Sequence, residues 1–193
     1  MNKKYEILKE ETKTIMGHTL HRILALRDFG EVKKGDVGGW IEKEENLSHE
    51  GNCWVSNDAL VFGYAHVFNN AVVFDNAFVF DNARVFGNSK VFENARVFGN
   101  ARVYDYACVF GNARVYGNAG IFDNAKVYGC TDVLDNVKVF GESEVFENAR
   151  LFSNVLVLEN AKVFGDSDIL DNATIRGNAI VKDMHVVDIE ILK

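Results

Sequence analysis

The chain has 193 residues, a formal net charge of −7 and a hydrophobic fraction of 48%. This length allows one or at most two domains, and the negative charge disfavours non-specific binding to nucleic acid. An odd count of three cysteines without metal spacing, and no signal-peptide or transmembrane pattern, predict a cytoplasmic protein without membrane contact.

Residues 1–36 lack the six-residue repeat that fills most of the chain. Residues 5–8 predict a short strand, and residues 15–26, with turn residues at Gly17 and His18, predict a hairpin. A repeat array with an open end would expose its core and unpaired backbone groups. We therefore expect residues 1–36 to form an N-terminal β-hairpin cap, with a separate binding module as the alternative.

From residue 55 to residue 186 the chain repeats one hexad, typified by residues 85–90 (VFGNSK), and an aliphatic residue holds every sixth position from Val55 to Val181. A period of six fits neither a helix nor a hairpin, and it indicates a solenoid of short strands and corners. Side-chain alternation predicts Val85 inward and Phe86 outward. Gly87 and Asn88 tolerate positive φ and so predict the corner. Three such sides close a triangular coil of 18 residues.

The pattern aliphatic-x-x-x-small-x resembles the hexapeptide repeat of left-handed parallel β-helix proteins. This resemblance implies an all-β, single-stranded, left-handed parallel β-helix of about eight triangular coils over residues 37–187, followed by a terminating strand at 188–193. His185 is expected to point inward in the last coil. Families with this fold include acyltransferases, zinc-dependent carbonic anhydrases and polymer-forming proteins, so the fold leaves the function open.

A second resemblance lies in residues 26–30 (LRDFG), 35–42 (GDVGGWIE) and 47–51 (LSHEG). They are similar to the segment that precedes long hexad runs in a family of uncharacterised bacterial and phage proteins. The resemblance implies a phage or prophage setting in a bacterial host cell. Because Val37 stands three hexads before Val55, we expect the helix to begin there, with Ile41 and Leu47 in small-residue positions.

Outward aromatic residues recur at equivalent positions one coil apart. The longest series, here called the Phe74 face, is accompanied by Lys90 and Lys126. The series consists of Phe74, Phe92, Phe110, Tyr128, Phe146 and Phe164. Monomers rarely expose apolar patches of this extent, so we predict self-association into a dimer or trimer through this face. The alternative is that stacked rings and basic stems cover one another without a partner.

Acidic residues predicted at the corners form a second candidate surface. They are Asp75, Asp81, Glu93, Asp105, Asp123 and Asp135. These carboxylates motivate an alternative function, in which a phage anti-defence inhibitor docks on a host nucleic-acid-binding complex such as a CRISPR effector. In such an inhibitor the carboxylates would take the place of DNA phosphates, but basic residues interleave with the acids, so the charge pattern would resemble that of DNA only in part. We expect no direct binding of this protein to nucleic acid.

Hexapeptide acyltransferases, as this resemblance implies, use a catalytic histidine and a cofactor groove between subunits, often with a projecting loop. Here the hexads contain no inserted loop, and His66 points outward with no nearby carboxylate in the sequence. The five histidines do not form the set that a zinc site needs. The sequence thus predicts a non-catalytic, phage-encoded interaction or scaffold protein without metal or cofactor. An acyltransferase is the less favoured alternative, with His66 as the residue to test.

Overall fold

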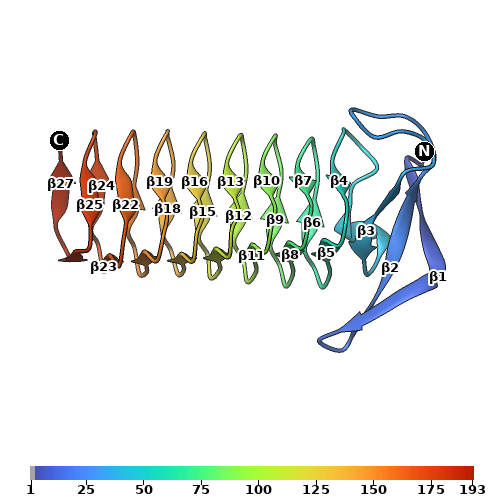
Figure 1. Ribbon diagram of the computed structural model, residues 1–193, viewed down its shortest axis with the longest axis horizontal. Helices are drawn as coiled ribbons and strands as arrows, with labels where there is room; N and C mark the ends of the chain where they lie inside the picture. Colours follow the sequence, from blue (N-terminus) through green and yellow to red (C-terminus); the bar gives the residue numbers. More distant parts are fainter. Residues whose placement is uncertain (1–2) are drawn as a thin grey trace.

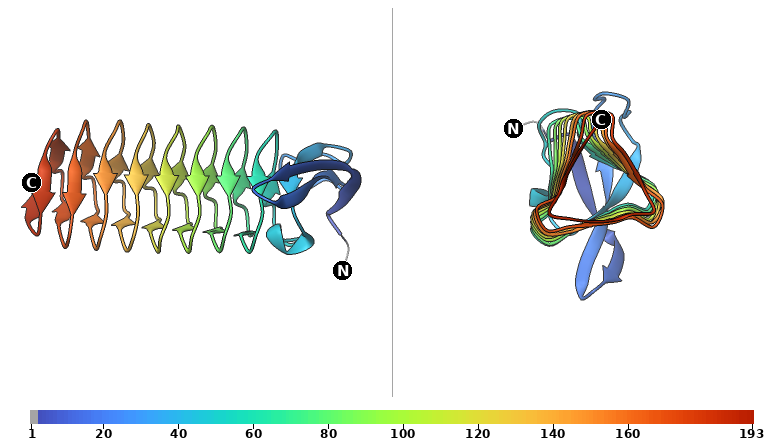
Figure 2. Two further views of the ribbon diagram at one scale, coloured as in Figure 1. Left: turned by 90° about the horizontal axis from the view of Figure 1, so that it is seen from below. Right: turned by 90° about the vertical axis from the view of Figure 1, so that its left-hand side faces the viewer.

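The computed structural model describes residues 3–193, which form a rod of stacked triangular coils with a β-hairpin at the N-terminal end (Figure 1). Viewed along the rod, the coils superpose as a triangle (Figure 2). Three sheets run along the rod, and all pairings between coils are parallel. The predicted all-β parallel β-helix of about eight coils is confirmed. Its left hand rests on the resemblance and stays a prediction.

The three sheets are numbered by the order of their first strands. Sheet I has 11 strands: β1 (Tyr5–Ile15), β2 (His18–Ala25), β3 (Val37–Ile41), β5 (Leu60–Val61), β8 (Phe78–Val79), β11 (Arg96–Val97), β14 (Arg114–Val115), β17 (Asp132–Val133), β20 (Arg150–Leu151), β23 (Asp168–Leu170) and β26 (His185–Val187). Sheet II has eight: β4 (Trp54–Val55), β7 (Val72–Val73), β10 (Lys90–Val91), β13 (Cys108–Val109), β16 (Lys126–Val127), β19 (Glu144–Val145), β22 (Lys162–Phe164) and β25 (Ile180–Lys182). Sheet III also has eight: β6 (His66–Val67), β9 (Arg84–Val85), β12 (Arg102–Val103), β15 (Gly120–Ile121), β18 (Lys138–Val139), β21 (Leu156–Val157), β24 (Thr174–Arg176) and β27 (Glu190–Leu192).

The core is built from the first and fifth residues of the hexads. Val85 and Ala83 are fully buried, as are their equivalents along the rod, whereas the ring of Phe86 lies outside and is half-buried. Equivalent residues pair across neighbouring coils, as Val91 does with Val109. The predicted division into inward and outward positions is confirmed, and it arises because strand side chains alternate.

Each corner places its third residue in the left-handed region, with φ of 58° at Asp75 and 71° at Gly87. The sequence predicted that Asn88 would share this role. In the structure the asparagines instead form ladders along the corners, in which each side-chain N–H donates to the next side-chain oxygen. One ladder joins Asn100, Asn118, Asn136, Asn154 and Asn172 at 3.1–3.2 Å.

The predicted phase of the first coil is wrong. Ile41 pairs with Val61 and Leu47 bridges to Val67, so both occupy aliphatic core positions. Val37 is 55% exposed. The step from Leu47 to Val55 takes eight residues instead of six. Because of these two extra residues, the core positions before Val55 lie two residues earlier in the sequence than the six-residue period predicts. The short 3-10 helix Glu44–Asn46 forms the corner between Ile41 and Leu47.

The last coil also departs from the predicted phase. Val186 pairs with Ile169 and is buried, whereas His185 pairs with Asp168 and is exposed. His185 therefore points outward, because this coil is one residue shorter than the regular 18.

The hairpin of β1 and β2 is joined to the rod through β3, which pairs antiparallel with β2 and parallel with β5. Gly38 and Gly39 allow this junction, because a Cβ on Gly39 would lie 2.7 Å from the carbonyl oxygen of Ala59. The glycine pair of the lead-in motif therefore serves close packing. The predicted domain bounds of 1–36, 37–187 and 188–193 stay predictions.

Candidate functional site

The Phe74 face lies on sheet II as one unbroken ladder of rings. From Phe74 to Phe164, successive ring centroids are 4.7–5.0 Å apart and the planes differ by 3–6°. Each ring is half-buried because its neighbours cover its two faces. The ladder therefore presents mainly ring edges to its surroundings.

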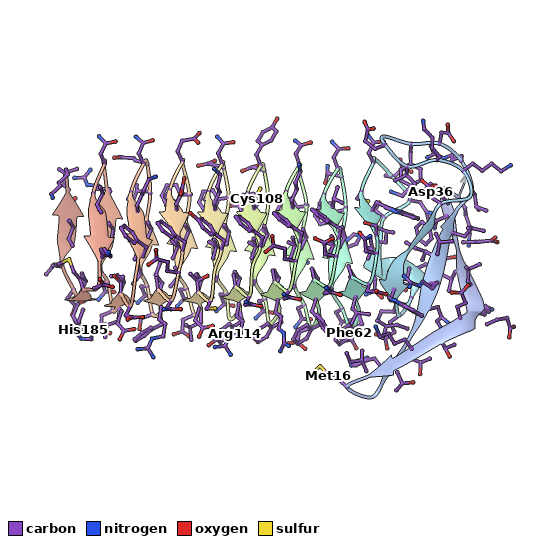
Figure 3. All side chains as sticks on the ribbon, viewed as in Figure 1. Met16, Asp36, Phe62, Cys108, Arg114 and His185 are labelled. Carbon is purple, nitrogen blue, oxygen red and sulfur yellow. The ribbon has the colours of Figure 1, made fainter. Side chains whose placement is uncertain are left out.

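The other two sheets carry shorter ladders of the same kind. Sheet I stacks Phe62, Phe80, Phe98 and Tyr116, and sheet III stacks Phe68, Phe86, Tyr104, Phe122 and Phe140. Phe62 and Arg114 lie on the side of the rod toward which Met16 extends at the hairpin tip (Figure 3). Ring stacking therefore occurs on all three sheets, and the Phe74 face differs from the other two ladders in having the longest series of rings.

Charged side chains beside the Phe74 face partly neutralise one another. Lys126 and Lys162 both approach Glu144, at 3.9 and 3.8 Å. Lys90 has no carboxylate within 4.0 Å among residues 3–193. The outward charged residues beside the Phe74 face therefore include both cations and a carboxylate.

The predicted acidic corners lie at the surface, and most of their carboxylates hydrogen-bond to the coil that follows. Glu93 accepts from the backbone N–H of Gly111 at 2.9 Å, and Asp123 accepts from that of Gly141 at 3.1 Å. Asp75, Asp81 and Asp135 accept equivalent bonds at 3.1–3.3 Å, and Asp105 lies at an equivalent corner. These carboxylates therefore hold successive corners together, a role that the sequence reasoning missed.

A groove of about 590 Å³ lies where the segment 30–37 passes over the first rungs of sheet II. Asp36 and Val37 line one wall, and Trp54, Phe74 and Lys90 line the other. Asp36 projects from this loop above the first coils (Figure 3). The structure thus brings two predicted interface residues together with the lead-in motif. Sequence reasoning missed the groove because the path of the loop depends on tertiary packing.

His66 stands on sheet III, with its ring centroid 4.8 Å from that of Phe68. Burial, and then the charge of Arg84, holds the pKa of His66 below its usual range. Its imidazole is therefore mostly neutral at neutral pH and able to accept a proton. Within the described chain, no group of three or more His, Cys, Asp or Glu side chains is placed to hold a metal ion.

The sequence predicts a protein without membrane contact, and the length and apolar character of the helices bear on that prediction. Among residues 3–193 the structure has no helix of the length and apolar character that a bilayer crossing needs.

Together these features define a β-solenoid repeat protein. A family model described as the YdcK β-solenoid repeat matches residues 95–109. A curated relative, the uncharacterised acetyltransferase YdcK of Escherichia coli strain K12, is 47% identical over 47 residues. That segment is 24% of this chain and 14% of the relative, so the chain covers a small part of the relative's length.

This similarity contradicts the prediction that the protein is not an enzyme, since the relative's name is that of an acetyltransferase. The prediction relied on the hexads having no inserted loop, on His66 having no nearby carboxylate in the sequence, and on the scattered positions of the five histidines. The absence of an inserted loop concerned the hexads alone, and residues 30–37, which precede them, line a groove on the first rungs.

Proposed function

We propose that this protein acts as an interaction or scaffold protein that self-associates through the Phe74 face. The observation that carries the proposal is the unbroken ladder of six rings along sheet II. Aromatic side chains dominate the energetics of protein interfaces, and pairing two ladders would bury ring edges that a single rod leaves outside. The proposal includes a phage origin and a place in the bacterial cytoplasm, which the lead-in motif and the odd cysteine count support.

Charge favours sheet II over sheet III. Its outer row mixes Lys126, Glu144 and Lys162, so a two-fold pairing can set opposite charges against each other. On sheet III the outer row holds Arg84, Arg102 and Lys138, and a second copy of that row would repel the first.

The test is the molar mass in solution by light scattering, over a range of protein concentration and at two salt concentrations. We expect a discrete oligomer, and we expect Phe110→Ser to weaken it while the circular dichroism spectrum is retained. Phe122→Ser, at an equivalent position on sheet III, is the matched control and should leave the mass unchanged. A wild-type monomer would refute self-association and favour the alternative, an anti-defence protein that docks on a host complex.

Acetyl transfer is a second candidate function, favoured by the name of the relative. The neutral His66 on sheet III is the candidate proton acceptor for this reaction, and the groove beside residues 30–37, on sheet II, is not lined by it. The assay is the consumption of acetyl-coenzyme A with a panel of amine and hydroxyl acceptors. Activity that falls in His66→Ala and persists in His18→Ala would support it, and no turnover with any acceptor would count against it.

A further inference from the structure

A row of cations on sheet III is interrupted by one glycine. The first outward residues of successive strands are His66, Arg84, Arg102, Gly120 and Lys138, which pair in register across the sheet. None of Arg84, Arg102 and Lys138 has a carboxylate within 4.0 Å in the part of the chain that the structure describes. Arginines of sheet I differ, since Arg114 pairs with Asp132 and Arg150 pairs with Asp168.

The backbone does not require glycine at position 120. Gly120 lies in strand β15 outside the left-handed region, and the nearest atom to a Cβ built there would be a ring carbon of Phe122 at 3.8 Å. Glycine in a strand has no side chain to pack, and it can mark a place where a ligand or another backbone approaches closely. The missing side chain therefore leaves an open space between the neighbouring rungs.

That room is a hollow of about 280 Å³, here called the Gly120 notch. Arg102 and Lys138 stand on either side of it, and the rings of Tyr104 and Phe122 border it, together with Asn100 and Asn118. The strands that carry Arg102 and Lys138 are two steps apart, or about 10 Å at the usual strand spacing. An anionic group placed over Gly120 can contact both cations.

The charge of the notch differs from that of the protein as a whole. Its lining holds two cations and no carboxylate, although the chain carries a net charge of −7. The corner acid Asp123 directs its carboxylate at the backbone N–H of Gly141. Cations without carboxylate partners, beside a cavity of this size, form an anion-binding arrangement, because a guanidinium offers a bidentate fork to phosphate or carboxylate oxygens.

We propose that the Gly120 notch binds the anionic group of a small ligand, a phosphate monoester or a carboxylate, whose apolar portion lies against the edges of Tyr104 and Phe122. Arg102 and Lys138 hold the anion from two sides, and Gly120 supplies the space. This site is separate from the Phe74 face, which lies on another sheet.

The test is calorimetric titration at low, fixed ionic strength with phenyl phosphate, inorganic phosphate and benzoate as probes. We expect saturable binding, tighter for phenyl phosphate than for inorganic phosphate because the ring adds apolar contact. Comparing phenyl phosphate with benzoate distinguishes a phosphate from a carboxylate source. Removing one charged partner with Arg102→Gln should weaken binding roughly tenfold.

Two variants at the glycine make the test specific. Gly120→Arg fills the notch and should abolish binding, whereas Gly120→Ala adds one methyl group to open space and should bind as the wild type does. Arg114→Gln, on sheet I, is the charge control and should have no effect. The proposal is overturned if no probe binds saturably, if Gly120→Arg binds normally, or if Arg114→Gln loses as much affinity as Arg102→Gln. Thermal unfolding of each variant verifies that it is folded.

Discussion

At the scale of single residues, the corners combine backbone strain with local compensation. A non-glycine residue in the left-handed region costs about 1–2 kcal/mol, yet aspartate and glutamate hold many of these positions. Glu93 at φ 57° illustrates the compensation, because its carboxylate accepts the backbone N–H of Gly111 in the next coil. A glycine at such a corner would relieve the strain but remove this hydrogen bond.

Ser153 lacks that compensation from its own side chain. It has φ 69°, and its backbone N–H already donates to Asp135, a bond that glycine keeps. We expect Ser153→Gly to stabilise the protein by about 0.5–1 kcal/mol, since relief of strain exceeds the entropy that glycine adds to the unfolded chain. The measurement is thermal unfolding, with Ser153→Ala as the control that should show no gain.

Thr131 is a second residue whose replacement should stabilise the protein. It takes an inward small-residue position, fully buried, and its hydroxyl has no hydrogen-bond partner. The serines at equivalent positions differ, since the hydroxyl of Ser89 donates to the carbonyl oxygen of Phe86 at 2.7 Å. Thr131→Val keeps the shape and removes the unpaired hydroxyl, so unfolding should cost about 1–3 kcal/mol more.

The comparison for Thr131→Val is Ser89→Ala, which removes a satisfied hydroxyl and should destabilise the protein. Urea unfolding of both variants measures the two changes. Equal effects on both would show that the Thr131 hydroxyl has a partner in solution.

At the scale of elements, the N-terminal segments form a plug over the first coil. The ammonium group of Lys4 is buried and donates to the carbonyl oxygen of Cys53 at 2.8 Å, and burial lowers the pKa of Lys4. The hydroxyl of Tyr5 donates to the carbonyl oxygen of Leu47 at 2.7 Å. These bonds satisfy backbone carbonyls in the irregular step between Leu47 and Val55.

The junction between hairpin and rod depends on the absence of a side chain at Gly39. A methyl group there would meet the carbonyl oxygen of Ala59 and a methyl carbon of Val55, each at 2.7 Å. We expect Gly39→Ala to destabilise the protein by about 1–3 kcal/mol, as overpacked sites do. Gly120→Ala is the matched control in denaturant unfolding, and a similar loss in both would contradict this assignment.

The elements differ in how far the sequence predicts them. The hexad run is predictable because each position repeats many times. The inward position of Val85 and the outward position of Phe86 are therefore each supported by many equivalent residues. The first coil occurs once, and aliphatic residues at both Val37 and Ile41 allow two phases. The structure has the phase of Ile41 and Leu47, which pair with Val61 and Val67 across the eight-residue step from Leu47 to Val55, and these pairings are tertiary contacts.

The candidate sites follow the same division. The ladder of the Phe74 face can be read from the period, whereas the groove beside it requires the course of residues 30–37. The Gly120 notch has a sequence signal, a glycine among cations when residues are compared at intervals of 18, but the size of the hollow is visible only in the structure.

At the scale of the whole molecule, each coil contacts mainly the coils before and after it. The free energy of unfolding is therefore nearly the sum of a contribution from each coil and one from each contact between adjacent coils. Val103 is fully buried in the middle of the rod. Val103→Asp would bury an unpaired carboxylate and should cost several kcal/mol, with the loss of the adjoining coils. Hydrogen exchange should show lost protection around residues 85–121, while Tyr106→Asp, at an exposed corner, should keep the wild-type pattern.

The 18-residue coil also constrains how such a gene can change length. Duplication or deletion of one whole coil by replication slippage returns every downstream residue to its original face, so the ring ladder and the cation row persist while the rod lengthens or shortens. A slip of a single hexad keeps the core intact but rotates everything downstream by one side of the triangle. The hydrophobic interior would tolerate that event, but the ring ladder and the cation row would each be broken, because their downstream parts would move to another side of the rod. Two hexad slips of the same sign would leave downstream surfaces on the third side, and only a third would restore them.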